Sequence, residues 1–478
     1  MSGFLKAKTK PSTVSHWIAT NSGPDTLHNH GRDDKLPESA DIVVVGAGIA
    51  GALLAYHLTH PEDVSETVPK GSRIVILEGS EVASSASHFA PATFASFPKL
   101  VRSRSEGGAG LTKAHAVDIL KQEWDNYARN KDVIKKHDLV HKVDLWEGNV
   151  MTVYKTQEGL DTAFNAFQQW NEALEESGSQ DYSNNVFCKD PKEALRVSRV
   201  QGAIGYSTRT AGTVHPHKLT TELLKLSISS TDYDVSLHTT TPALSITPKE
   251  DQHIVETSRG TIKAKRVVLC TNAHTPHLFP EEHPLKSFIF PIRIQMGVFT
   301  PPPEFSGTKS PQTSYGFPTG YCATSTSGIV VGISVGDYIG ANIGKSEDYI
   351  CNSDDTVLLP ECTKYLEGFM TRTFDGWNEN AIGEGLMRTW TGVIAATIDR
   401  LPLIGPVPDT PGLFISAGYN GHGMSTTHTC GRALAKLILH ETWDQQFPEA
   451  YIISKERLAR KLPEGGHYQL VTGVNKTT

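Results

Sequence analysis

Six residues near the N-terminus, Gly46-Ala47-Gly48-Ile49-Ala50-Gly51, have the spacing Gly-x-Gly-x-x-Gly. The stretch before them, DIVVV, is typical of a buried parallel strand, and the stretch that follows, rich in alanine and leucine, is typical of a helix. In such a turn the first glycine permits a tight bend, the second lets backbone approach a pyrophosphate, and the third lets the helix pack on the strand. The helix N-terminus then offers N–H groups to the phosphates. The pattern predicts a dinucleotide-binding turn.

A second strand, RIVILEGS at 73–80, supports this interpretation because it ends in Glu78 and Gly79. A carboxylate at this place can accept hydrogen bonds from ribose hydroxyls. A membrane span is disfavoured, since it needs about 20 apolar residues and three glycines interrupt this run. A glycine-rich turn in an unrelated α/β core stays open as the alternative.

The composition narrows the class of protein. A chain of 478 residues favours two domains. The net charge of −7 argues against nucleic acid or an anionic membrane as the partner. Six cysteines without a CxxC pair indicate reduced thiols. The N-terminus has no apolar signal region and the C-terminus no peroxisomal tripeptide. A cytoplasmic location is therefore expected, a peroxisomal one is not excluded, and the oligomeric state is undetermined.

Hydrophobic periodicity predicts the organisation around this turn. Helices are expected at 111–135, 159–177 and 217–229, with strands at 141–154, 235–274, 285–300 and 328–340. Residues 1–39 form an arm that Trp17 and Ile18 would anchor. The predicted nucleotide domain is discontinuous, from 40–110, 200–280 and 385–445. A second domain takes 111–199 and 281–384, and a tail takes 446–478.

The segments LPESADIVVVGAGIAG and RLPLIGPVPDTPGLFISAGYNGHGMSTTHTCGRALAKLIL (400–439) together resemble the flavin-dependent amine and amino-acid oxidase family. This family includes D-amino-acid, glycine and sarcosine oxidases, gamma-glutamylputrescine oxidase-like proteins and fungal members. The resemblance implies an α/β fold in which a Rossmann-like FAD-binding domain is interleaved with an antiparallel-sheet substrate domain. It also implies FAD as cofactor and a small-molecule amine or amino acid as substrate.

The resemblance, together with the glycine turn, assigns a set of expected FAD contacts. The residues are Gly46, Ala47, Gly48, Ile49, Ala50, Gly51, Glu78, Gly79, Ser87, His88, Ala243, Thr271, Asn272, Gly418, Asn420, Gly421, His422, Gly423 and Met424. The helix that begins near Gly423 can face the pyrimidine end of the flavin and stabilise the negative charge of its reduced form. His422 is either a catalytic residue or a structural histidine of this turn.

The sequence departs from the family at three places. The segment ASSASHFAPATF (83–94) replaces the usual flavin-side motif, and His88 is either joined covalently to the flavin or packed as a loop histidine. Trp390 stands where sarcosine oxidases carry a flavin-linked cysteine. Met424-Ser425 replaces a lysine, and no lysine occurs in TSGIVVGISVGD, where a second one is expected. Oxygen as the electron acceptor is expected from the family and is put in doubt by these lysine positions.

Four residues are expected to carry catalysis or substrate binding: Arg293, Tyr321, Trp390 and His422. An arginine can clamp a carboxylate with two hydrogen bonds, and Arg388 and Tyr315 are further candidates. A core tryptophan and a surface-paired arginine are the plain alternatives. His215 and His217 flank Pro216 without a third ligand, so no metal is expected.

Three functions remain open. The favoured one is an FAD-dependent enzyme that oxidises a C–N bond of a secondary amine or amino acid to an imine, with reoxidation by O2. The second is an FAD dehydrogenase or oxidative cyclase that passes electrons elsewhere. The third is a flavoprotein subunit without catalysis. Oxygen consumption with an amine separates the first two, and flavin reduction by any amine excludes the third.

Overall fold

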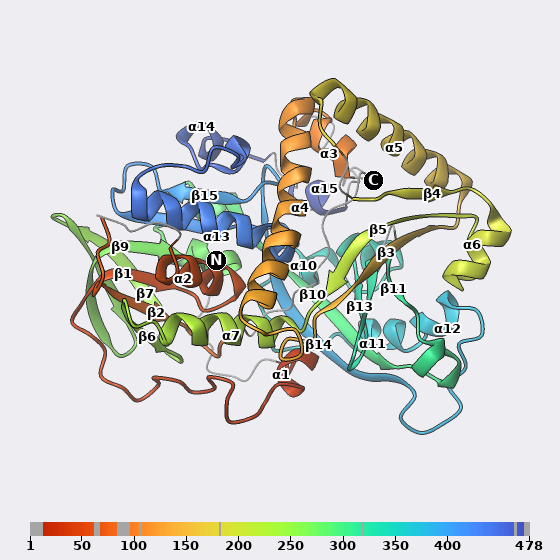
Figure 1. Cartoon of the computed structure of the whole chain (residues 1–478), viewed down its shortest axis with the longest axis horizontal. Coiled ribbons are helices and arrows are strands. Elements are labelled where there is room, and N and C mark those ends of the chain that lie inside the picture. Colours follow the sequence, from red (N-terminus) through yellow and green to blue (C-terminus); the bar gives the residue numbers. More distant parts are fainter. Residues whose placement is uncertain are drawn as a thin grey trace.

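The computed structural model describes residues 13–61, 67–83, 96–104, 108–180, 183–317, 320–462 and 466–472. Two eight-stranded sheets form two halves of the molecule, and the long helix α4 (Lys113–Lys136) stands between them in the view of Figure 1. Helices α2 (Ile49–Thr59) and α13 (Gly423–His440) lie with the first sheet. This arrangement places the predicted nucleotide turn at one sheet and the predicted substrate residues at the other.

The first sheet is built around β1 (Ser39–Val45), which pairs in parallel with β2 (Arg73–Leu77) and with β9 (Gly260–Leu269). Ile42, Val43 and Val44 are fully buried, as expected of a strand that is covered on both faces. The other strands are β6 (Asp234–His238), β7 (Ala243–Lys249), β8 (Gln252–Thr257), β15 (Leu403–Pro406) and β16 (Leu413–Ala417).

The second sheet has the order β14-β10-β13-β12-β11-β3-β5-β4. Its pairs are antiparallel except for β11 with β3. The strands are β3 (Trp146–Tyr154), β4 (Val186–Cys188), β5 (Gly205–Thr213), β10 (Ile289–Thr300), β11 (Thr313–Phe317), β12 (Gly320–Ser325), β13 (Gly328–Ile333) and β14 (Gly385–Thr397).

The remaining helices connect or cover these sheets. They are α1 (His16–Ala19), α3 (Phe97–Val101), α5 (Gln157–Ser177), α6 (Pro191–Ser198), α7 (Pro216–Ile228), α8 (Leu285–Phe288), α9 (Val335–Gly340), α10 (Ser346–Tyr349), α11 (Pro360–Glu367), α12 (Phe369–Thr373), α14 (Lys455–Leu458) and α15 (Gly466–Thr472). Short 3-10 turns lie at Asn272–Leu278, Pro303–Phe305, Gly307–Lys309 and Glu449–Tyr451. Within the described ranges, no helix is long and apolar enough to cross a membrane.

The expected fold class is confirmed: the architecture is mixed α/β, with a second sheet interleaved in sequence with the first. Two strands lie in a different sheet from the one that the predicted domains imply. The ranges 200–280 and 385–445 were assigned to the nucleotide domain, but their strands β5 and β14 pair in the second sheet. The strand predicted at 328–340 stops at Ile333, because the Ser334 side chain accepts a hydrogen bond from the Asp337 N–H and starts α9.

The described part of the N-terminal arm, which begins at residue 13, contacts both halves. Trp17 is buried and packs in an apolar cluster with strands of the second sheet, whereas Ile18 is half-buried. Further along, the His30 carbonyl accepts from the Thr239 N–H at 3.0 Å, just after β6 of the first sheet. The arm therefore bridges the two sheets, and Trp17 is its main anchor.

Candidate functional site

The glycine-rich turn connects β1 to α2, and each glycine has a steric role. Gly46 has φ +110°, and a Cβ there would lie 2.6 Å from the Cys270 carbonyl oxygen. Gly51 faces the Gly46 carbonyl too closely for any side chain. Gly48, by contrast, has open space where a Cβ would point, and as the N-cap it has no side chain that could cap α2. The first-turn N–H groups therefore face a place that fits a pyrophosphate.

Glu78 follows β2 and fixes this turn from the side. Its Oε2 accepts from the Ala47 N–H at 2.9 Å and its Oε1 from the Ser80 N–H at 2.8 Å. The Thr241 N–H donates to the Glu78 carbonyl at 2.7 Å, which brings the start of β7, at Ala243, close to Gly79. Each carboxylate oxygen can accept a second bond, so the geometry leaves the ribose role of Glu78 available.

Asn272 joins the ends of two neighbouring strands. It follows β9 in a left-handed conformation, with φ +44°, and its Oδ1 accepts from the Gly418 N–H at 3.0 Å and from the Tyr419 N–H at 3.4 Å. Thr271 beside it shares a hydrogen bond of 2.9 Å with Thr275. The carboxyl ends of β1, β9 and β16 thus meet at one edge of the sheet, where ligands bind in open α/β sheets.

The second glycine-rich turn leads from β16 into α13. Asn420, with φ +52°, accepts from the Thr397 N–H at 2.9 Å, which ties this turn to the end of β14. Buried Asn126 on α4 donates to the Met424 carbonyl at 2.8 Å and accepts from the His428 N–H at 2.8 Å. Asn126 was not predicted from the sequence, because a lone asparagine within a helical pattern gives no signal of a distant partner.

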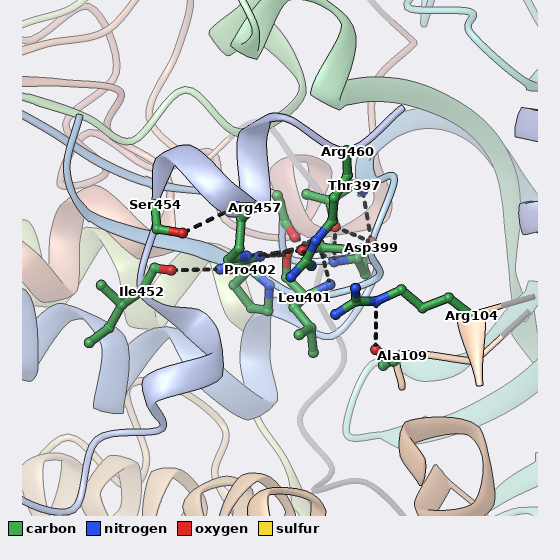
Figure 2. A network of polar contacts seen from close by, with 12 residues as sticks. Arg104, Ala109, Thr397, Asp399, Leu401, Pro402, Ile452, Ser454, Arg457 and Arg460 are labelled. Atoms are coloured by element: carbon green, nitrogen blue, oxygen red, sulfur yellow. Dashed lines mark hydrogen bonds and ion pairs between the residues drawn. The ribbon is translucent and has the colours of Figure 1, made fainter. Parts of the chain in front are cut away.

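A buried ionic network holds the segment that follows β14. Asp399 accepts two hydrogen bonds from Arg457, at 2.9 and 3.2 Å, and one from Arg460 at 2.6 Å (Figure 2). Arg457 also donates to the carbonyls of Leu401 and Pro402 at 3.1 and 3.0 Å. This network fixes residues 399–402 against the C-terminal segment, two residues beyond the Thr397 that holds Asn420.

His422 is the exposed N-cap residue of α13, and its surroundings favour the neutral imidazole. Burial of its surroundings lowers the pKa of His422, and Lys99 lowers this pKa further. Its Nδ1 lies 3.0 Å from the Asn420 carbonyl oxygen. Since a carbonyl only accepts, the proton of the neutral ring is on Nδ1. Nε2 is then left as a proton acceptor.

Lys99 on α3 is a cation that the sequence analysis missed. Its side chain is exposed, yet burial lowers the pKa of Lys99, and the charges of Arg400 and Arg102 lower it further. Lys99 makes no side-chain hydrogen bond or ion pair with the residues that the structure describes. It therefore contributes a positive charge near His422. A lysine this far from the expected positions, on a short helix, could not be assigned from sequence.

Among the predicted substrate residues, Tyr321 and Trp390 come together and Arg293 does not. Tyr321 and Trp390 share one apolar cluster with Met296. Arg293 alternates with Ile294 and Met296 along β10, so its side chain lies on the opposite face. There it donates to the Asp354 carbonyl at 3.1 Å. The sequence alone did not fix on which face of the sheet each side chain of β10 would lie.

Two predicted flavin contacts, Ser87 and His88, lie outside the described residues. His215 and His217 have structural partners in the arm: His215 Nε2 lies 2.9 Å from Thr20 Oγ1, and His217 Nδ1 lies 2.8 Å from Asn21 Nδ2. In the described part of the chain no group of three His, Cys, Asp or Glu side chains could hold a metal ion.

The family described as "FAD dependent oxidoreductase" matches residues 41–437. The chain belongs to this family. It is 22% identical over 413 residues to "Probable oxidoreductase OrdL" of Haemophilus influenzae, covering 84% of this chain and 83% of that protein. The structure resembles glycine oxidase from Geobacillus kaustophilus, with a TM-score of 0.66, 16% identity and coverage of 88% and 99% of the two chains. It also resembles L-amino acid deaminase from Proteus vulgaris, with a TM-score of 0.65, 17% identity and coverage of 90% and 99%.

Membership in the FAD-dependent oxidoreductase family identifies the cofactor of the site between the two glycine-rich turns. FAD is the cofactor, and the two glycine-rich turns fit it: the open side of Gly48 suits the pyrophosphate, and the N-terminus of α13 suits a group that becomes negative on reduction. The resemblance to flavin-dependent amine and amino-acid oxidases, inferred from the two sequence segments, is confirmed at the level of family and fold.

Proposed function

We propose that this FAD-dependent oxidoreductase oxidises a C–N bond of a secondary amine or an amino acid and that O2 accepts the electrons. When bound, FAD would supply the redox chemistry, as the acceptor of a hydride from the carbon next to the amine nitrogen. The names of the similar structures, a glycine oxidase and an L-amino acid deaminase, support an amine-bearing small molecule as substrate. The imine product would be hydrolysed by water.

The observation that carries this proposal is the state of His422 at the start of α13. An amine must lose its extra proton before a hydride can leave the neighbouring carbon. His422 has a lowered pKa and an exposed side chain, and its Nδ1 proton is committed to the Asn420 carbonyl. Its Nε2 is therefore suited to take a proton from the bound ammonium.

Lys99 supports O2 as the acceptor, although both lysine positions expected from the family are empty. A fixed positive charge stabilises negative charge that develops on O2. Lys99 lies close enough to His422 to lower its pKa, and so it stands on the α13 side of the site.

The test is rapid mixing of the FAD-loaded enzyme with amines in the absence of O2. His422→Gln is expected to slow flavin reduction by roughly 10²–10⁴-fold while keeping its FAD. The wild-type rate is expected to fall as the pH drops through the lowered pKa of His422, and the variant should lack this limb. His440→Gln, at the far end of α13, is the matched control. Reduction of the wild type by no amine would overturn the proposed function.

Acid precipitation of the yellow protein decides between the two interpretations of His88. Colour that stays with the pellet would show a covalent flavin and make His88 the residue to replace. Colour released into the supernatant would show that FAD is held without a bond and that His88 has another role.

A further inference from the structure

Gly392 occupies an unusual place in the second sheet. It lies in the middle of β14, between Trp390 and Ile394 on the same face of the strand, and pairs with Ile294 of β10. A Cβ on Gly392 would meet no heavy atom of a described residue within 4 Å. Since glycine weakens a strand interior, a glycine here needs a reason.

The other glycines of this sheet have a structural reason to be glycine, and Gly392 lacks it. A Cβ on Gly297 would lie 2.8 Å from Leu386, and a Cβ on Gly332 would lie 2.7 Å from the ring of Tyr321. Gly328 has a φ of +139°. Gly392 has neither a close neighbour nor a positive φ. Close approach of a ligand is one reason for a glycine in a strand, and it requires the open space that Gly392 leaves.

The open space at Gly392 adjoins the flavin side of the molecule. Ile394, the next residue on this face, has its Cδ1 3.5 Å from the position of a Cβ on Gly421, in the turn before α13. A molecule over Gly392 would therefore lie one strand step from the turn that carries His422. Ile294, across from Gly392, is half-buried and adds an apolar floor.

Beside this space, aromatic rings of the arm cover β14. Trp390 is 1% exposed, and His16 of the arm stacks on it at 6.4 Å between ring centroids. Trp17 packs in the same cluster as Trp390 and Tyr321. Thr13 Oγ1 accepts from the Thr391 N–H at 2.8 Å and so clamps the arm to the edge strand. The arm thus covers Trp390 and holds this part of β14 in place.

We propose that the space over Gly392 is a subsite for an apolar substituent of the amine substrate, bounded by Ile294 and Ile394. This inference rests on the proposed function and deepens it. It assigns the enzyme to amines that carry a bulky apolar group, because Gly392 makes room and the side chains beside it, Ile294 and Ile394, are apolar and half-buried.

The test compares Gly392→Val with wild type on glycines of increasing N-substituent size: sarcosine, N-butylglycine and N-benzylglycine, with D- and L-alanine and D- and L-phenylalanine as a side-chain series. Flavin reduction without O2 gives KM and the limiting rate for each. The wild type is expected to prefer the larger members at least tenfold. Gly392→Val is expected to lose at least tenfold in kcat/KM on these, mainly through KM, and less than threefold on sarcosine and alanine. Gly392→Ala should fall between.

Two controls keep the outcomes separate. Gly340→Ala, another glycine with open space at the Cβ position and no positive φ, is expected to behave as wild type. The FAD content and thermal unfolding of Gly392→Val should be unchanged, since valine suits a strand. An equal loss on small and large amines, or no loss, would overturn the subsite while the proposed function stands. Reduction by no amine would overturn both.

Discussion

At the scale of single residues, the three glycines of the first turn do different work although they share one motif. Gly46 and Gly51 are required by neighbouring protein atoms, the carbonyls of Cys270 and Gly46. At Gly48, by contrast, no described residue comes within 4 Å of the position of a Cβ. Substitutions at different glycines of this six-residue turn should therefore have different effects: some should impair folding, and others should impair only cofactor binding.

Gly48→Ala is expected to fold normally and to bind FAD at least tenfold more weakly, because the methyl group would enter the space that faces the pyrophosphate. Gly46→Ala is expected to fold poorly, since its Cβ would press on the Cys270 oxygen and φ is +110°. The ratio of flavin absorbance to protein absorbance, with circular dichroism, measures both effects. Equal FAD content in Gly48→Ala and wild type would contradict the pyrophosphate assignment.

Lys99 permits a second prediction at this scale. Lys99→Met is expected to slow reoxidation of the reduced enzyme by O2 at least tenfold and to leave anaerobic reduction by an amine within threefold, because the charge acts on O2. Lys99→Arg should keep most of the rate. The wild-type rate should fall at a pH below the usual range for lysine, since the pKa of Lys99 is lowered. A reoxidation rate independent of both charge and pH would exclude Lys99.

At the scale of elements, buried polar contacts rather than local propensity position the turn before α13. Asn126 on α4 holds the first turn of α13, and Asn420 holds the end of β14. Asp399 then anchors the chain after β14 to α14 through Arg457 (Figure 2). The flavin-side turn is thus fixed from three elements that are far apart in sequence.

Asp399→Asn is expected to destabilise the protein by roughly 3–5 kcal/mol, because it leaves the guanidinium of Arg457, whose side chain is 7% exposed, without its countercharge. Chemical denaturation measures this loss. Asp409→Asn is the matched control: its ion pair with Lys455 has side chains 75% and 64% exposed, so a loss of at most about 1 kcal/mol is expected. Similar losses in both variants would contradict the structural role given to Asp399.

At the scale of the whole molecule, the N-terminal arm ties the two sheets together. It clamps β14 at Thr391, packs Trp17 on the second sheet, and bonds the chain after β6 at Thr239. Buried histidines of the strand-to-helix connection hold it in between, through Thr20 and Asn21. The arm is therefore a structural part of both halves.

These histidines make the attachment of the arm dependent on pH. Burial is the main cause that lowers the pKa of His215 to about 3 and of His217 to about 4. Below pH about 6.5 the unfolded chain binds protons that the folded chain excludes, so stability is complete above this pH and is lost as the pH falls toward 4. The loss is expected to be on the order of a few kcal/mol.

The measurement is the free energy of unfolding and tryptophan fluorescence between pH 4 and 7. His217→Gln, which keeps a partner for Asn21, should flatten the slope, and His141→Gln, an exposed histidine, should not. A wild-type stability that is constant over this range would contradict the neutral, buried state of both histidines.

The sequence by itself determined the nucleotide turn, its flanking strand and helix, the long amphipathic helices and the family. These signals are local: glycine spacing, apolar periodicity and a second glycine-rich turn before a helix. The predicted helices at 111–135, 159–177 and 217–229 correspond to α4, α5 and α7 for this reason. The separate roles of Gly46, Gly48 and Gly51 could be assigned from the motif alone.

Only the tertiary structure decided which side chains face the site. Alternation along β10 put Arg293 on the face away from Trp390, and a shift of one residue would have reversed this. The sheet to which β5 and β14 belong, the place of Lys99 near His422, and the open space at Gly392 depend on contacts between distant segments. Local sequence patterns do not predict contacts with residues that lie hundreds of positions away in the chain.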